Sequence, residues 1–182
     1  MTYAAYRAQE AGGDGKHEYL RGEVFEMAGG TPEHARLQSR MAAELGRLLS
    51  GRPCEAFSSD LRVRVVETNL ATYPDLSVIC GKVETSADDE DAATNPTVIV
   101  EVLSDTTEAY DRGEKFAHYR HLSSLREYVL VSQRTQRLEV FRRTGERGWE
   151  YEDKGPGETM RLRSLDIDIA VDAVYATRLG AA

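Results

Sequence analysis

Two acidic side chains stand inside strand-like stretches that offer no obvious place for a charge. Glu101 lies in TVIVEVL (97–103), where strand alternation places it on one face together with aliphatic side chains. Asp75 lies near the start of YPDLSVIC (73–80), which is also apolar on both faces. Burying an isolated carboxylate is costly, so such groups are normally ion-paired, metal-bound or protonated. Either residue alone fits a buried ion pair or a strand-end carboxylate. Together they predict a shared site for Mg²⁺ (or Mn²⁺), which binds one or two carboxylates plus water and phosphate oxygens.

Lys115 is the third residue of this candidate site. It follows Glu101 by fourteen positions and lies about one turn into a helix predicted over residues 111–122. A helix that returns along the sheet would bring the Lys115 ammonium over Glu101. There it could orient an attacking water and stabilise charge that develops on a phosphate. The alternative is a surface ion pair with Asp111, which is four positions earlier on the same helix.

Hydrophobic spacing predicts the elements that must position these residues. A short helix ends at Gly12-Gly13, and a hairpin over residues 19–28 turns at Arg21-Gly22. A long helix begins at the N-cap Thr31, with Pro32 in its first turn, and ends before Gly51. Its inward stripe is Leu37, Met41, Leu45 and Leu48. The remaining predicted segments are strands over 61–65, 73–80, 97–103 and 128–131, an acidic loop over 82–96, an outer hairpin over 138–151, an edge strand over 160–171 and a short helix near Ala173. This order predicts an α/β sandwich with a mixed central sheet.

Length and composition restrict the class of protein. The 182 residues predict one domain over 1–182, and the longest apolar runs are too short to span a membrane. The first residues show no cationic stretch followed by an apolar one, as a signal peptide would. Cys54 and Cys80 each lie in an apolar-rich stretch, which predicts two free thiols and a cytoplasmic protein.

The charge is unevenly distributed along the chain. The net charge of −8 argues against a protein that coats DNA through many Lys and Arg contacts. Residues 83–114 hold ten acids and one base, whereas residues 115–147 hold eight bases and three acids. An acidic cluster followed by a basic one fits a metal site beside an anionic substrate, although two solvated faces of opposite sign would give the same pattern.

The residues Pro74-Asp75, Glu101-Val102-Leu103 and Lys115 resemble the PD-(D/E)xK nuclease superfamily. Its Lys usually stands two positions after the acidic residue, where this chain has Leu103. One branch is similar in having its Lys on the next helix. It is the Uma-type family of putative restriction endonucleases, formerly a domain of unknown function. Five blocks resemble that family in order and cover nearly the whole chain: HEYLRGEVFEMAGGTPEH (17–34), SDLRVRV (59–65), YPDLSVICG (73–81), NPTVIVEVLSDTT (95–107) and DRGEKFAHYRHLSSLREYVLVS (111–132).

The resemblance implies a restriction-endonuclease-like α/β (α+β) fold. Its mixed central sheet would be flanked by helices, with an added N-terminal hairpin and C-terminal strands. Asp75 and Glu101 would hold the metal, Lys115 would be the catalytic Lys, and Tyr119 would line the site. The chain departs from the family at Asp105, where Pro is more common, and this difference concerns the path of the loop more than the chemistry.

Two further residues could line the site. His34 lies on the inward stripe near the start of the long helix, where it is either a catalytic base or a partly buried His with its hydrogen bonds satisfied. Glu18 flanks the predicted hairpin, which could approach the site, and it could equally be a solvated strand residue.

These observations predict a Mg²⁺-dependent endonuclease that hydrolyses DNA. A symmetric homodimer is expected because a cut through both strands uses two sites. The alternative is a non-catalytic protein of the nuclease fold that binds nucleic acid or regulates another protein. Leu103 in place of the usual Lys and the acidic overall charge keep this alternative open.

Overall fold

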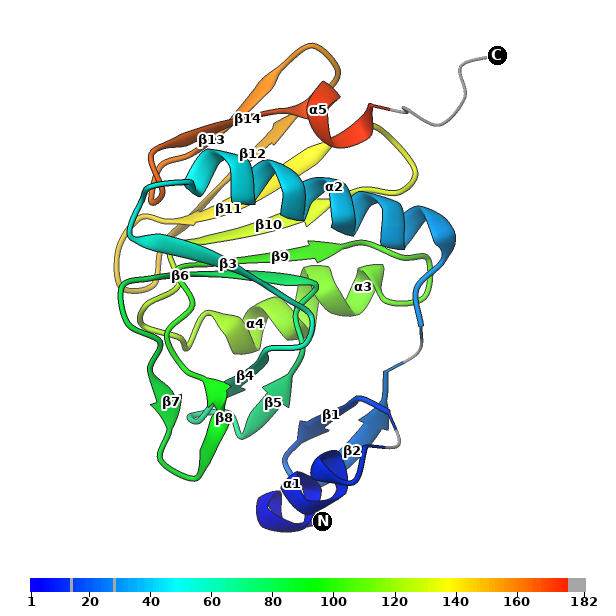
Figure 1. The fold of residues 1–182 in the computed structure, drawn as a ribbon, viewed down its shortest axis with the longest axis vertical. Coiled ribbons are helices and arrows are strands. Elements are labelled where there is room, and N and C mark those ends of the chain that lie inside the picture. Colours follow the sequence, from blue (N-terminus) through cyan, green and yellow to red (C-terminus); the bar gives the residue numbers. More distant parts are fainter. Residues whose placement is uncertain (14, 28, 177–182) are drawn as a thin grey trace.

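A six-stranded mixed sheet forms the centre of the fold. The computed structural model describes residues 1–13, 15–27 and 29–176. The strands of the central sheet, in spatial order, are β12 (Trp149–Lys154), β11 (Leu138–Arg143), β10 (Glu127–Val131), β9 (Val98–Val102), β6 (Leu76–Cys80) and β3 (Cys54–Ser58). Strands β9 and β10 are parallel, and the other neighbours are antiparallel. The predicted mixed sheet is confirmed (Figure 1).

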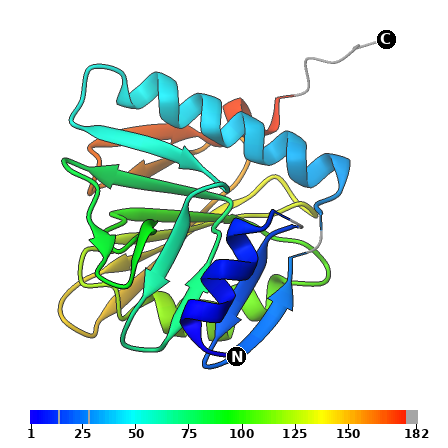
Figure 2. The same ribbon diagram turned by 60° about the horizontal axis from the view of Figure 1, so that its bottom comes forward.

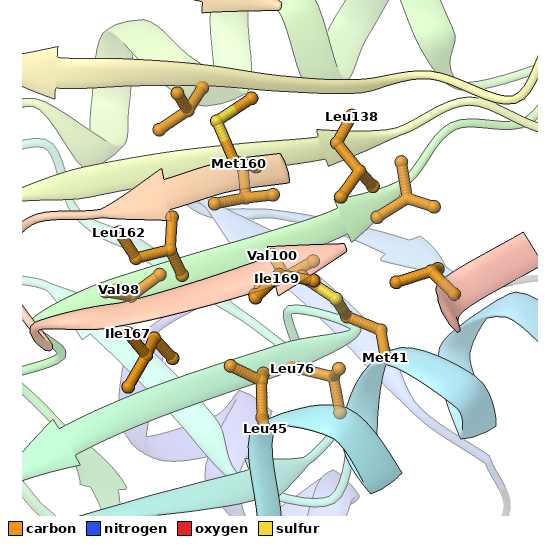
Figure 3. Close-up of a cluster of buried hydrophobic side chains, with 14 of the residues drawn as sticks. Met41, Leu45, Leu76, Val98, Val100, Leu138, Met160, Leu162, Ile167 and Ile169 are labelled. Carbon is orange, nitrogen blue, oxygen red and sulfur yellow. The ribbon is translucent and has the colours of Figure 1, made fainter. Parts of the chain in front are cut away.

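One face of this sheet carries the long helix α2 (Pro32–Leu49) (Figure 1). The Thr31 side chain accepts a hydrogen bond from the His34 N–H and caps the helix as predicted. The inward stripe ends at Leu49, which is buried, and not at the predicted Leu48. Strands β13 (Thr159–Leu162) and β14 (Ile167–Ala170) and helix α5 (Val171–Tyr175) complete the layer. Figure 3 shows the resulting core, in which Met41 and Leu45 of α2 pack near Leu76 of β6.

The C-terminal segment differs from its prediction. A single edge strand was expected over residues 160–171, but β13 and β14 pair with each other as a separate antiparallel hairpin. Asp166 adopts a left-handed conformation (φ 55°) between them, which an Asp tolerates better than most residues. The apolar side chains on both strands pointed to burial, but they did not indicate the reversal.

A second six-stranded sheet lies beside the other face and was not predicted. Its strands, in spatial order, are β2 (Glu23–Glu26), β1 (His17–Leu20), β5 (Leu70–Thr72), β4 (Arg62–Val65), β8 (Asp89–Ala93) and β7 (Thr85–Ser86). The predicted hairpin is confirmed, with φ of 50° and 100° at Arg21 and Gly22, the conformation of a tight two-residue turn. Helix α1 (Tyr3–Ala11) lies against this hairpin (Figure 2).

The segment predicted as an acidic loop over 82–96 contains β7 and β8. Asp89 is buried within β8 because Arg62 of β4 forms an ion pair with it, with 2.9 Å between Nε and Oδ2. A buried partner from another strand therefore allows a strand where the local run of acids predicted a loop. The predicted strand over 73–80 is shorter than expected, because β6 begins only at Leu76.

The prediction of two free thiols is wrong. Strands β3 and β6 pair in antiparallel register with Cys54 opposite Cys80, and the two form a disulfide. Each stretch was apolar by itself, but pairing of two strands that are 26 residues apart brings the sulfurs together. The argument from free thiols for a reducing compartment falls with it. In the described part of the chain, no helix is long and apolar enough to cross a membrane.

Candidate active site

Strands β6 and β9 bring the two predicted carboxylates face to face. Leu76 pairs with Val100 in antiparallel register, and Asp75 and Glu101 stand one position beyond that pair. The backbone N–H of Asp75 donates to Glu101 Oε2 (3.3 Å), and the N–H of Val102 donates to Asp75 Oδ2 (2.7 Å). Because Pro74 has no N–H, β6 begins only after it, and the Asp75 side chain is free to turn toward β9.

Glu101 is buried, with only 4% of its side chain exposed. Its Oε1 accepts hydrogen bonds from the Lys115 ammonium and from the Tyr119 hydroxyl, both at 2.9 Å. The pKa of the Glu101 carboxyl is raised to about 8, mainly by burial. The Lys115 ammonium opposes this increase, and the charges of Asp111 and Asp75 add to it. Without a further cation, this carboxyl therefore sits in an environment that favours a proton.

Lys115 comes from an irregular helical segment. Helix α3 (Glu108–Tyr110) continues into a π-helical turn over Asp111–Lys115 and then into α4 (Phe116–Tyr119), so the expected helix over 111–122 begins earlier and contains a wide turn. π-Helical turns are rare in proteins, and those that occur are often found at functional sites. The wide turn directs Lys115 at Glu101, and Asp111 lies 3.4 Å from the same ammonium.

Lys115 contacts both Glu101 and Asp111 in one buried cluster. The expected pair with Asp111 exists, but it faces the interior and not the surface, because both side chains are nearly inaccessible. Burial alone would lower the pKa of Lys115, yet the neighbouring carboxylates of Glu101 and Asp111 raise it. The ammonium therefore keeps its proton.

A bidentate ion pair fixes the π-helical turn against the central sheet. Two nitrogens of Arg112 each donate to an oxygen of Glu139 on β11 at 2.7 Å, and a third donates to Glu108 at 2.8 Å. The Tyr128 hydroxyl of β10 donates to the backbone carbonyl of Asp111 at 2.9 Å. These contacts determine the direction in which the turn presents its side chains.

His34 approaches the site from the first turn of α2. Its Nε2 lies 3.1 Å from Asp75 Oδ2, and this hydrogen bond raises the pKa of the imidazole against the opposing effect of burial. Gly30 leaves room for the ring, because a Cβ there would lie 2.6 Å from His34 Nδ1. His34 therefore contacts a predicted metal ligand directly.

Glu18 of β1 forms another wall of the same pocket. It is buried and accepts hydrogen bonds from the hydroxyls of Thr72 (2.6 Å) and Tyr110. The pocket has a volume of about 680 Å³, and Glu18, Asp75, Glu101, Lys115 and His34 all line it. Tyr119 does not line it. This residue is completely buried, and its hydroxyl donates a hydrogen bond to Glu101.

Sequence reasoning missed two parts of this arrangement. Asp111 was considered only as a surface partner of Lys115, although its i, i+4 spacing to a predicted catalytic Lys places it on the same helix face. Tyr110, whose hydroxyl holds Glu18, has no signal in the sequence, because the contact spans 92 positions.

The donor atoms fit a hard divalent cation in kind. Asp75 and Glu101 provide two adjacent carboxylates at a pocket wall, and a buried carboxyl with a raised pKa is stabilised in its charged form by a cation. Among the described residues, no group of three or more His, Cys, Asp or Glu side chains is arranged so that it could hold a metal ion by itself. Two carboxylates are ligands of the kind and number that Mg²⁺ or Mn²⁺ commonly takes from a protein, whereas a structural zinc site takes four protein ligands.

Comparisons with known proteins cover most of the chain. A family model described as "Uma2: Putative restriction endonuclease" matches residues 3–172. Two Synechocystis proteins, slr1290 and sll1609, are each 34% identical to the chain. The first match covers 88% of this chain and 83% of slr1290, and the second covers 82% of this chain and 84% of sll1609.

A solved structure shares the fold. It is a crystal structure from Anabaena variabilis, described as a putative nuclease belonging to DUF820, with a TM-score of 0.70 and 18% identity. The match covers 87% of this chain and 89% of that chain, which confirms the restriction-endonuclease-like fold. The family model and the arrangement of β6, β9 and the following helix agree, so the chain belongs to the Uma2 family of putative restriction endonucleases.

Proposed function

We propose that this protein is a Mg²⁺-dependent (or Mn²⁺-dependent) endonuclease that hydrolyses phosphodiester bonds in DNA. The observation that carries the proposal is the cluster of Asp75, Glu101 and Lys115 on one wall of a pocket, with the Lys115 ammonium 2.9 Å from Glu101. The family description and that of the Anabaena structure support nuclease chemistry.

Asp75 and Glu101 would hold the metal ion in this proposal. When bound, the ion supplies a Lewis acid that stabilises negative charge on the phosphate and on the leaving oxygen. The N–H of Val102 and the imidazole of His34 both contact Asp75 Oδ2, so that carboxylate is oriented before any ion binds. His34 therefore acts as a positioning residue for Asp75.

Lys115 would assist the attacking water. One of its three N–H donors is used by Glu101 and a second points toward Asp111, which leaves a donor for water or for a phosphate oxygen. A fixed ammonium in a site with little water stabilises developing negative charge more strongly than a solvated one. Tyr119 fixes the Glu101 side chain through its hydroxyl and so keeps the distance between the carboxylate and the ammonium constant.

Partners and location follow from the substrate. A cut through both strands of a duplex would use two sites, so a symmetric homodimer is the proposed assembly on a duplex. We propose action on DNA in the cytoplasm. Since Cys54 and Cys80 are bonded, this location now rests on the proposed substrate alone.

Cleavage of plasmid and single-stranded DNA tests the proposal. Purified protein is incubated with each substrate in Mg²⁺, in Mn²⁺ or in EDTA, and Asp75→Ala is the matched variant. The proposal expects cleavage that requires a metal ion and is lost in Asp75→Ala. Binding without cleavage would favour the non-catalytic alternative, which the buried Leu103 at the usual Lys position keeps in consideration.

A further inference from the structure

The pocket above Asp75 and Glu101 gives restricted access to the site. Only 16% of the Asp75 side chain, 4% of Glu101 and 7% of Lys115 are exposed. The β1–β2 hairpin contributes Glu18, Leu20 and Phe25 to one wall of this pocket. A duplex is stiff, and its paired bases stay inside the helix, whereas a single strand can bend into a recess and turn its bases outward.

The charge of the pocket also disfavours a duplex. Glu18, Glu23, Glu26 and Glu114 add carboxylates to those of the site itself. Among the described lining residues, Lys115 is the only Lys or Arg, and it is already paired with Glu101. An acidic lining repels the phosphates of any nucleic acid, but a single strand carries fewer phosphates per length than a duplex, so the lining disfavours the duplex more.

One aromatic side chain offers a different kind of contact. Phe25 stands directly opposite Glu18 in the β1–β2 pairing, so both side chains lie on the face that lines the pocket. The Phe25 side chain is 47% exposed. Among the described residues that line the pocket, it is the only exposed aromatic side chain. A solvent-exposed ring can stack with any base, because every base has a π-face.

The other rim carries neutral hydrogen-bonding groups. Ser104, Thr106 and Thr107, which follow β9, line the pocket with hydroxyl groups. Hydroxyls of Ser and Thr commonly contact phosphate and sugar oxygens of nucleic acids. An aromatic wall, a hydroxyl-bearing rim and a carboxylate–lysine floor match the base, backbone and scissile phosphate of one strand.

We propose that the pocket receives single-stranded DNA, with a base stacked on Phe25 and the adjacent phosphate directed to the Asp75–Glu101–Lys115 floor. This inference rests on the proposed function, because it names the form of substrate that the same site accepts. One site then suffices for each cut, so cleavage does not require a dimer.

Binding measurements test this inference independently of cleavage. Fluorescence anisotropy is recorded with a labelled single-stranded oligonucleotide and with a duplex of the same length, in Ca²⁺, a cation that also binds oxygen ligands. We expect tighter binding of the single strand and a loss of roughly 10-fold in Phe25→Ala, as for one lost base–aromatic stack. Phe25→Trp should retain binding. Val66→Ala is the matched control, since Val66 is 60% exposed and does not line the pocket.

Cleavage rates then separate failure of this inference from failure of the proposed function. Equal binding of the two forms, or single-strand binding that is unchanged in Phe25→Ala, would overturn the inference. If both forms were cut equally in that case, the nuclease proposal would still stand. Single-strand binding that depends on Phe25, without cleavage in Mg²⁺ or Mn²⁺, would support the inference and refute the nuclease. Thermal melting shows that each variant is folded.

Discussion

The Lys115 ammonium lies 2.9 Å from Glu101 Oε1, although the two residues belong to different elements and stand fourteen positions apart. In the usual motif of the superfamily the Lys stands on the same strand as the acidic residue, at the position that Leu103 occupies here. Leu103 is buried in the apolar cluster beside α4. The π-helical turn therefore supplies from another element the ammonium that the strand lacks.

Removing this ammonium should impair cleavage while leaving the metal ligands in place. For Lys115→Ala we expect activity to fall by roughly 10²-fold or more, as for one preorganised electrostatic contact. Metal affinity should not fall, because a neighbouring ammonium repels a cation. Lys115→Arg should restore little, since a planar guanidinium does not replace a compact ammonium. Cleavage rates and Mn²⁺ titrations measure the two effects separately. Full activity in Lys115→Ala would remove the residue from the mechanism.

The stability of the same variant should depend on pH. Breaking a buried ion pair typically costs about 3 kcal/mol of unfolding free energy. Glu101 can avoid that cost by taking up a proton, so the loss should be small at pH 6 and larger at pH 9. Denaturant unfolding of Lys115→Ala and of the wild type at the two pH values measures this loss of unfolding free energy. An equal loss at both would mean that Glu101 does not titrate in this range.

Glu101 should link metal binding to pH. Its pKa is raised from 4.5 to about 8, mainly by burial. A raised pKa contributes stability that is fully present below pH 4.5 and is lost as the pH rises through 8. Without metal, the wild-type protein should therefore lose stability between pH 6 and pH 9 relative to Glu101→Gln, which carries no charge there.

Adding Mg²⁺ should compensate for this loss. A ligand that binds only the folded state raises the melting temperature, so the increase should be larger at pH 9 than at pH 6. In Glu101→Gln the Mg²⁺-induced increase in melting temperature should disappear, since one of the two carboxylates that hold the ion is lost. Differential scanning fluorimetry with and without Mg²⁺ measures both. An unchanged increase in the variant would place the ion elsewhere.

His34 should act through Asp75. Loss of a side chain that orients a metal ligand typically costs 10- to 100-fold in metal affinity or activity. His34→Ala should therefore weaken Mn²⁺ binding and cleavage by roughly 10-fold or more. His121→Ala is the matched control, because His121 makes an exposed contact with Glu67 at 2.7 Å and neither residue lines the pocket. Equal behaviour of the two variants would refute the positioning role.

Arg112 should position the π-helical turn. Arg112→Lys loses the fork that holds both oxygens of Glu139, so Lys115 should be less well aimed at Glu101. We expect a lower cleavage rate with unchanged Mn²⁺ affinity, because Arg112 contacts neither proposed metal ligand. Arg134→Lys, in an exposed pair with Asp105, should leave both unchanged. Weakened Mn²⁺ binding in Arg112→Lys would instead indicate a general structural defect.

Local sequence patterns predicted the elements that depend on local rules. The cap at Thr31, the turn at Arg21-Gly22 and the apolar strand around Glu101 all follow from side-chain type and spacing, and the structure confirms them. The carboxylates were recognised because a charge in an apolar strand is costly wherever it lies. The structure brings Asp75, Glu101 and Lys115 together, while their roles remain proposals.

Features that depend on partners distant in the sequence were not predictable. Asp89 is a strand residue because Arg62 neutralises it, and Cys54 is oxidised because strand pairing places Cys80 opposite. A short stretch of sequence around either residue does not contain its partner. The π-helical turn likewise follows from contacts of Arg112 and Tyr128 with other elements and not from helix propensity.

The central claim is that Asp75 and Glu101 bind the cation that supports DNA cleavage. Its most direct test is the cleavage rate of an end-labelled oligonucleotide as a function of Mn²⁺ concentration, for wild type, Glu101→Gln and the control Asp91→Asn, which changes an exposed carboxylate of β8. We predict a rate that saturates with Mn²⁺ and vanishes in EDTA, a fall of roughly 10²-fold or more in Glu101→Gln, and no change in Asp91→Asn. Cleavage by folded Glu101→Gln at the wild-type rate and the same Mn²⁺ dependence would contradict it.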